Sequence, residues 1–367
     1  EILENEKYKI ILKIIGAFTA LYLFLVGIKG LSIGIKLLGG DFANAVMTTT
    51  SNPLTALFIG ILATTLFQSS STTTSLIVGM VSGGALTLSG AIPMIMGANI
   101  GTTVTNTIIS IGYINRDKEF QRAFSASTVH DLFNMLAVLI LLPLEIAFGF
   151  LEKAATGLGM LLFGTISADE VFNSPIKKAI KWGAKQLESI SFDNTTFLII
   201  ISVLLTFGML YGIVKLLRSL VLSRVEHFFD MYIFTTPIRA ILFGVLLTIL
   251  VQSSSITTST VVPLAGAGVL TLRQIYPFTL GANIGTTVTA LLASLTLNVT
   301  ALVAAFSHLF FNIFGILIIY ANPLLRDIPI RVAERIADIS LRNKFIPIIY
   351  LLIIFFGLPL LIIFLGS

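Results

Sequence analysis

The sequence contains no cysteine and only three histidines among its 367 residues. Without cysteine there is no disulfide framework, no thiolate metal site and no cysteine nucleophile. Three histidines also argue against a histidine-rich metal cluster. We therefore expect no bound cofactor.

Charged residues are scarce as well: they make up 11% of the chain, whereas 56% of it is hydrophobic. Several apolar stretches are long enough to cross a bilayer as helices. The composition predicts an all-α polytopic membrane protein, placed in the plasma membrane, without a separate soluble domain. The net charge of +5 is interpreted as loop bias and not as a nucleic-acid surface. The longest apolar stretches are Ile10–Val26, Leu198–Leu222, Ala301–Tyr320 and Phe345–Leu365.

The chain contains an internal duplication. Gln68–Ser71 returns as Gln252–Ser255, and the nonapeptide Gly97–Thr105 returns unchanged as Gly281–Thr289. The second copy of each motif lies 184 positions after the first, as 252 lies after 68. Nine identical residues held in register with a second motif indicate a true repeat. We define repeat 1 as residues 10–150 and repeat 2 as residues 194–322.

Each repeat is predicted to contain a re-entrant helical hairpin and a discontinuous transmembrane helix. Apolar arms too short to span the bilayer meet at tips 67–75 and 251–259. The glycine-rich nonapeptides predict helix breaks at 97–103 and 281–287. Three full crossings in each repeat is an odd number, so a connection that does not cross gives the second repeat inverted topology.

The segments outside the repeats complete the predicted topology. Residues 151–193 are expected to form an extramembrane linker, and its lysines a solvated loop. Residues 323–343 are expected to form an interfacial amphipathic helix, with charged side chains such as Arg331 and Asp338 opposite apolar ones such as Ile330 and Ala337. Residues 344–367 are expected to form a final transmembrane helix. Most Lys and Arg fall in loops on one side, which we assign to the cytoplasm.

The tips and breaks carry the polar groups of a predicted binding site. Unwound backbone inside a bilayer must be buried in protein or line a hydrated cavity, so we expect all four segments to share one cavity. Helix N-termini there suit an oxyanion, and hydroxyls suit either charge. Side-chain amide oxygens and hydroxyls are Na⁺-type ligands. The candidates of this kind in the tips and breaks are Gln68, Asn99, Thr102 and Asn283.

No Lys or Arg occurs in either tip or either nonapeptide. An anion bound there without compensating charge is costly, so the composition predicts obligatory cotransport with cations. Asp131 is the one acidic residue that we place centrally. Repeat 2 has a loop shorter by six residues, after which His130 and Asn134 return as His308 and Asn312, so Leu309 is the counterpart of Asp131. We expect Asp131 to be an additional cation ligand present in one half only. His130 and His308 are interpreted as structural, with both ring nitrogens satisfied by neighbouring groups.

The same motifs also have alternative interpretations, most of them purely structural. A Ser/Thr cluster in a membrane helix often serves helix packing, and the glycines of the nonapeptides can merely permit close helix contact. A less favoured alternative for Asp131 is a carboxylate near a span end that is paired with His130 or water. A passive channel is another alternative function. An intramembrane serine hydrolase built on Ser70 or Ser254 is disfavoured, because no Gly-x-Ser-x-Gly elbow occurs.

The paired Gln-Ser-Ser-Ser and Gly-Ala-Asn-Ile-Gly-Thr-Thr motifs resemble the type II sodium-dependent phosphate cotransporters and their bacterial relatives. The stretch Gly97–Glu145 looks especially close to the first repeat of that family. The resemblance implies sodium-coupled symport of inorganic phosphate by alternating access, with no enzymatic activity. The nearest alternative is a sodium-coupled carrier of sulfate or a dicarboxylate. Expected partners are phosphate, Na⁺ and the lipid bilayer, with a homodimer left open and no nucleic acid.

The same resemblance assigns residues to ligands. It implies that phosphate is held by Ser69, Ser70, Ser71, Ser253, Ser254 and Ser255. It implies that one Na⁺ is held by Gln252, Ser253, Thr286 and Thr289. Asp131 and Asn134 match the His-Asp-Phe-Phe-Asn pattern of electrogenic members, in which the Asp supports an extra Na⁺.

This chain also departs from the family pattern. Ala98 and Ala282 stand where some members have serine. Tyr113–Asp117 replaces a Gln-Val-Gly-Asp-Arg pattern, so the further cation site that uses that Gln and Asp does not carry over.

Overall fold

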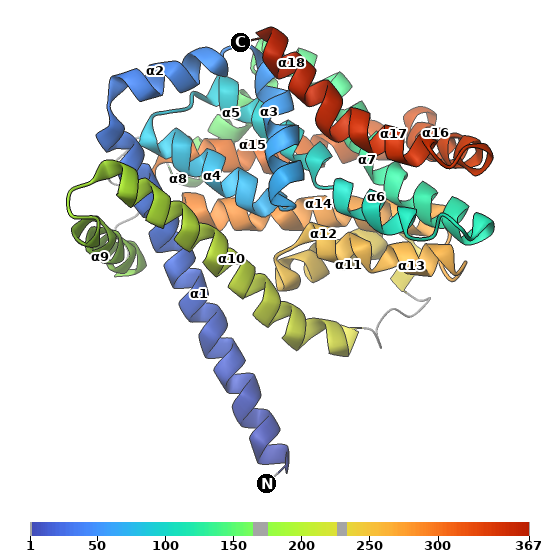
Figure 1. The fold of residues 1–367 in the computed structure, drawn as a ribbon, viewed down its shortest axis with the longest axis horizontal. Helices are drawn as coiled ribbons and strands as arrows, with labels where there is room; N and C mark the ends of the chain where they lie inside the picture. The colour runs from blue at the N-terminus through green and yellow to red at the C-terminus, as the bar shows by residue number, and fades with distance from the viewer. Residues whose placement is uncertain (1, 164–174, 226–232, 367) are drawn as a thin grey trace.

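A computed structural model describes residues 2–163, 175–225 and 233–366, and the regular structure in these segments is helical throughout. Figure 1 shows most helices gathered in one body, from which the N-terminal part of α1 protrudes. The helices up to residue 163 are α1 Ile2–Leu38, α2 Gly40–Thr49, α3 Pro53–Phe67, α4 Ser70–Gly83, α5 Leu88–Gly101, α6 Val104–Ile111, α7 Asp117–Phe148 and α8 Phe150–Phe163. The later helices are α9 Pro175–Ile190, α10 Thr195–Val225, α11 Pro237–Val251, α12 Ser254–Ser259, α13 Val261–Gly266, α14 Leu272–Ser294, α15 Val299–Gly315, α16 Pro323–Arg342, α17 Ile346–Leu352 and α18 Leu358–Gly366.

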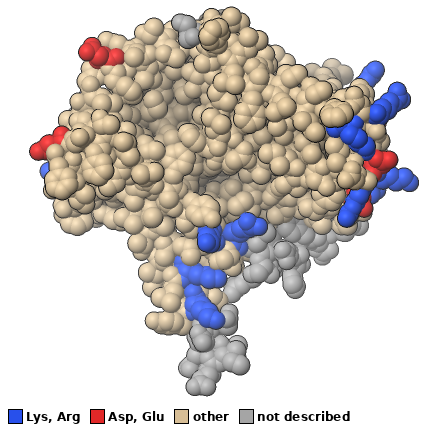
Figure 2. Space-filling view, viewed as in Figure 1, with Lys and Arg blue, Asp and Glu red and all other residues tan. Residues whose placement is uncertain are grey.

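Within the described residues, five helical stretches are long and apolar enough to cross a membrane, and a bent α2–α3 pair raises the number to six. Figure 2 shows a broad face with few charged side chains, and Lys and Arg gathered at the end where α16 lies and near the α1 stem. A chain with this pattern is a multi-pass membrane protein. The five stretches are Tyr8–Leu38, Asp117–Phe148, Thr195–Val221, Val299–Tyr320 and Ile346–Gly366.

The long helices α1 and α10 pack side by side because small residues line their contact. Gly27 of α1 faces Ser202 and Thr206 of α10, and a Cβ atom on Gly27 would lie 2.6 Å from the Thr206 hydroxyl oxygen. Close backbone approach through small residues is typical of helix pairs in membranes. The first predicted span of each repeat thus packs against its counterpart in the other.

Two short helices in each repeat meet at a turn formed by the repeated glutamine. Gln68 between α3 and α4 has φ 54°, and Gln252 between α11 and α12 has φ 56°. This left-handed conformation is uncommon outside glycine, and it ends the first helix of each pair at the glutamine. The predicted arms are therefore present as helices. Their penetration into a bilayer as re-entrant hairpins stays a prediction.

The two predicted helix breaks have different outcomes. In repeat 1 the interruption between α5 and α6 is confined to Thr102 and Thr103. In repeat 2, α14 runs without interruption from Leu272 to Ser294, so the break predicted at 281–287 is wrong. The repeated glycines serve contact instead: a Cβ atom on Gly281 would collide with the Ile241 carbonyl of α11, and one on Gly97 with the Leu57 carbonyl of α3.

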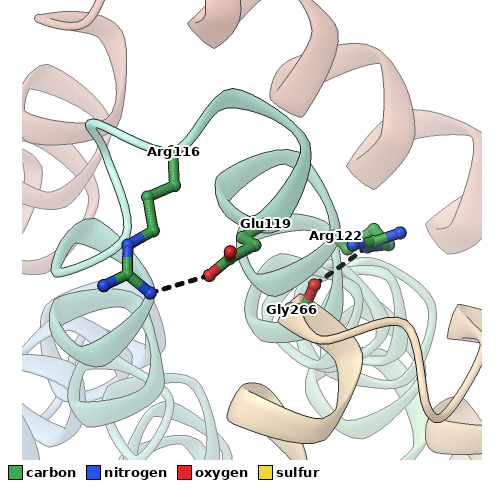
Figure 3. A network of polar contacts seen from close by, with 4 residues as sticks. All are labelled: Arg116, Glu119, Arg122 and Gly266. Atoms are coloured by element: carbon green, nitrogen blue, oxygen red, sulfur yellow. Dashed lines mark hydrogen bonds and ion pairs between the residues drawn. The ribbon is translucent and has the colours of Figure 1, made fainter.

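The N-terminal end of α7 connects the two repeats. Arg122 donates from Nε to the Gly266 carbonyl at the end of α13, over 3.0 Å (Figure 3). Arg116 forms an ion pair with Glu119 one turn before this contact, as the same view shows. The arginine satisfies one of the carbonyls that a helix leaves unpaired at its C-terminal end. A side chain of repeat 1 thus caps the C-terminal end of α13 in repeat 2.

The described segments outside the repeats are mostly helical. α16 covers residues 323–342 and packs on α7 through an apolar side that includes Ile330, Ala333 and Ala337. The helix predicted at 323–343 is present, and its place at a membrane interface stays a prediction. In the predicted linker, α8 packs on α15 and α9 on α1, while residues 164–174 lie outside the described part of the chain.

Candidate substrate and ion site

Both glutamine turns open onto one cavity of about 530 Å³. Gln68, Ser69 and Thr72 line it from repeat 1, and Ser253 and Ser255 line it from repeat 2. Residues that are 184 positions apart in the sequence are therefore brought to one space. The predicted convergence of the two tips is present, but no described lining residue belongs to the predicted breaks 97–103 and 281–287, so the expectation that all four segments share this cavity is wrong.

The repeated glutamines are held in matching ways. Thr105 donates its hydroxyl to Gln68 Oε1 over 2.9 Å, and Thr289 donates to Gln252 Oε1 over 2.9 Å. Each glutamine amide donates to the carbonyl three residues before it, at Thr65 or Ile249. Each Oε1 atom keeps a free lone pair that can face a ligand.

The six serines predicted to bind phosphate divide into two groups. Ser69 and Ser253 cap their helices by accepting the backbone N–H groups of Thr72 and Ile256, at 3.2 and 3.3 Å. These two and Ser255 line the cavity. The other three are buried in the first turns behind the cavity wall and do not line it: Ser70, Ser71 and Ser254.

Buried asparagine side chains form hydrogen bonds between the two repeats. Asn99 of repeat 1 donates to Asn312 Oδ1 over 2.7 Å and shares a hydrogen bond with His308 Nε2 over 2.9 Å. In the matching arrangement, Asn283 of repeat 2 donates to Asn134 Oδ1 over 2.8 Å and is bonded to His130 Nε2 over 2.7 Å. Each nonapeptide asparagine is thus bound by the histidine and asparagine of the opposite repeat. Among the predicted sodium ligands, the Oδ1 atoms of Asn99, Asn134 and Asn283 are already occupied by these contacts.

Both histidines are fully buried and bind asparagine side chains, in agreement with a structural role. The expectation that both ring nitrogens are satisfied is wrong, because Nδ1 of His130 and of His308 has no hydrogen-bond partner. Neither ring is bonded to a serine of the motifs in the described residues, so the nucleophile–base contact that a serine hydrolase needs is not formed.

Asp131 is fully buried in α7 and lies against α17 and α6. Its Oδ2 atom accepts hydrogen bonds from the Tyr350 hydroxyl at 2.9 Å and from Thr107 at 3.4 Å, while Oδ1 has no partner. Tyr350 was not anticipated from the sequence. Asp131 and Asn134 contact different partners, so the structure does not bring them into one ligand set.

The threonines predicted to bind Na⁺ also separate. Thr289 contacts both Gln252 and the Ser71 hydroxyl, the latter over 3.4 Å. Thr286 and Thr102 donate to carbonyls of their own helices, at Ala282 and Ala98. Gln252, Ser253 and Thr289 thus gather around one turn, whereas the Thr286 hydroxyl is engaged elsewhere. The Thr102 carbonyl accepts the Ser255 hydroxyl over 3.4 Å and so joins the first break to the second tip.

The cavity contains a positive charge that the sequence did not place there. Arg218 of α10 lines it and is the one charged residue among the described lining residues. Arg218 lies far from both motifs in the chain and has no counterpart in the duplication, so no sequence signal pointed to it. Thr105 and Asn312 were also missed, although both belong to repeated motifs and the repeat was a signal for them.

Comparison with known proteins gives the chain a family. The family model described as Na⁺/Pi-cotransporter matches residues 23–167 and 204–322, so each matched part contains one copy of the repeated motifs. Human sodium-dependent phosphate transport protein 2B is 36% identical over 93% of this chain and 63% of its own length. Rat sodium-dependent phosphate transport protein 2A is 37% identical over 93% of this chain and 66% of its own length.

The chain therefore spans less than two thirds of these relatives. No solved structure matches it. The family model covers well over half of the chain, in two parts that follow the internal repeat. The protein belongs to the Na⁺/Pi-cotransporter family.

Proposed function

We propose that this protein carries inorganic phosphate across the plasma membrane together with Na⁺, by alternating access between two inverted repeats. The observation that carries the proposal is the meeting of both Gln-Ser-Ser-Ser turns at one cavity. A site built between two repeats from interrupted helices is typical of secondary transporters. The names of the relatives, which are sodium-dependent phosphate transport proteins, support the same substrates.

Phosphate is assigned to the space between the two turns. Ser69, Ser253 and Ser255 offer hydroxyl groups there, and the N-terminus of α4 adds backbone N–H groups and the positive end of its dipole. Arg218 adds one full positive charge. Na⁺ supplies the remaining positive charge, because a doubly charged anion is otherwise left without compensation in a low-dielectric environment.

Sodium is assigned first to the group around Gln252, Ser253 and Thr289, of which Ser253 lines the phosphate space and Thr289 is bonded to Gln252. Gln68 and Thr105 form the matching pair in repeat 1 and are the second candidate. Asp131 is a third, separate place for a cation, because its Oδ1 atom is buried and unpartnered. A carboxylate in one half only makes the cycle electrogenic under this scheme.

Uptake of radiolabelled phosphate into proteoliposomes tests the proposal. We expect an inward Na⁺ gradient to drive accumulation that an equal K⁺ gradient does not drive. Ser253→Ala should raise the phosphate KM, because it removes a hydroxyl at the cavity wall together with the cap of α12. Ser189→Ala, at an exposed position of α9, is the matched control.

Two results would overturn the proposal. The first is phosphate uptake that ignores the Na⁺ gradient. The second is displacement of phosphate by sulfate or succinate at equal concentration, which would point to a carrier of another oxyanion.

A further inference from the structure

Four lysines converge on a second cavity, away from the glutamine turns. Lys29 and Lys36 of α1 and Lys177 and Lys181 of α9 line a space of about 220 Å³, together with Ser82 and Asn298. The described lining of this lysine cavity includes no Asp or Glu. The sequence alone presents the α9 lysines as part of a solvated loop and does not connect them with α1.

The convergence is fixed by close packing of α9 on α1. The Tyr22 hydroxyl of α1 donates to the Ala179 carbonyl of α9 over 3.0 Å. Gly183 of α9 lies so close to α1 that a Cβ atom there would be 2.6 Å from Val26 and 2.7 Å from the Tyr22 hydroxyl. Helices in such contact hold their side chains in a defined relation, so the lysine cavity is a built feature of the fold.

The like charges in this cavity repel one another. Lys177 and Lys181 are one turn apart on α9, a spacing at which equal charges destabilise a helix. Lys29 is half-buried, and Lys36, Lys177 and Lys181 all act on it electrostatically. In the described segments Lys29, Lys36 and Lys181 form no ion pair. A bound anion relieves this repulsion.

The other polar groups of the cavity already have partners. Ser82 accepts the Ser32 hydroxyl over 3.0 Å, and its carbonyl accepts the Asn298 amide over 3.3 Å. Asn298 Oδ1 accepts the N–H of Ala301 over 3.0 Å. The donors left for a ligand are therefore the ammonium groups of Lys29, Lys36 and Lys181, each a compact charge with three N–H bonds. Such a set suits a small, highly charged oxyanion with several acceptor oxygens.

We propose that the lysine cavity binds a phosphate group, carried either by an anionic lipid headgroup or by free phosphate. Trp182 follows Lys181 and is 63% exposed, as an aromatic side chain at a membrane–water interface is. Basic residues beside such an interface attract anionic headgroups. The site is independent of the glutamine turns, so it stands even if the transported substrate is not phosphate.

Trp182 is the single tryptophan of the chain and follows Lys181 directly, so its fluorescence serves as a reporter beside the site. The purified protein is placed in phosphatidylcholine nanodiscs, in Na⁺-free buffer so that sodium-dependent binding at the glutamine turns is suppressed. One arm increases the phosphatidylglycerol content, and the other adds inorganic phosphate to phosphatidylcholine nanodiscs. Trp182 emission and the thermal unfolding midpoint are recorded in both. A response in the first arm alone identifies a lipid headgroup, and a response in the second identifies free phosphate.

The variant Lys29→Gln/Lys181→Gln should lower the affinity for the ligand that gives a response by roughly 25-fold. This value follows from the contribution of each lysine near an anionic group. The control Lys178→Gln/Lys185→Gln removes the same charge from exposed positions outside the cavity lining and should leave the response unchanged. Equal weakening in both variants would reduce the effect to general surface charge and overturn the proposal. No change of emission or midpoint with either ligand would overturn it as well.

Discussion

At the scale of single residues, Arg218 changes the charge balance expected from the sequence. Both motifs lack basic residues, and the sequence therefore assigned all compensation of the anion to Na⁺. The fold brings Arg218 from α10 to the same cavity. The sequence did not predict Arg218 as a site residue, because the spacing of the motifs does not indicate which residues of α10 line the cavity.

Replacement of Arg218 by Gln should raise the phosphate KM about three- to five-fold and leave the maximal rate nearly unchanged. The effect is modest because the side chain is exposed and its charge is screened by solvent. Initial rates of phosphate uptake in proteoliposomes measure it. Lys215→Gln is the control, since it removes an equal charge from an exposed position of α10 that does not line the cavity. Equal effects of the two variants would show that only the surface potential matters.

The second prediction at this scale concerns Asp131. Asp131→Asn should reduce by one the number of positive charges moved with each phosphate, because the amide keeps the shape of the side chain but loses its charge. Currents on solid-supported membranes, divided by radiolabelled phosphate uptake, give this ratio. Tyr350→Phe removes the 2.9 Å hydrogen bond to Oδ2 without removing the charge, and it should leave the ratio intact. An unchanged ratio in Asp131→Asn would refute the role given to this carboxylate.

At the scale of elements, the helices and the paired turns were predictable, because apolar length and the repeat define them. Pro53 and Pro237 each begin a short helix behind a capping residue, Asn52 or Thr236, which is a common start signal. The break predicted in repeat 2 was wrong because glycine has two uses in membrane helices. It permits irregular backbone, and it also permits close packing, and the sequence does not say which.

A substitution in α14 tests the packing role of these glycines. Gly281→Ala should destabilise the protein by about 1–3 kcal/mol, because the new methyl group collides with the Ile241 carbonyl of the adjacent helix. Gly208→Ala in α10 is the control: a Cβ atom there meets nothing within 4 Å, so the change should be neutral or slightly stabilising. Thermal unfolding in detergent compares the two. Equal midpoints would mean that α14 moves away from α11 without cost.

At the scale of the whole molecule, the site is composite. The duplicated sequence predicted that two turns share one cavity, and the structure brings them together. The exchange of asparagine partners was not predictable, because identical copies of His and Asn give no indication of whether they bind within a repeat or across repeats. Asn99 and Asn283 both bind across. The inverted orientation of the repeats and a homodimer stay predictions.

The exchanged asparagines imply that the two halves are obligate folding partners. A half that folds alone buries amide and imidazole groups without their partners, at a cost of about 1–3 kcal/mol for each group. Chains cut between Phe163 and Pro175 should therefore accumulate only when both fragments are made in the same cell, as membrane-fraction immunoblots would record. Stable accumulation of either fragment alone would contradict this. Each repeat supplies the hydrogen-bond partners of the other repeat's buried asparagine. The loss or replacement of one repeat is therefore expected to destabilise the other.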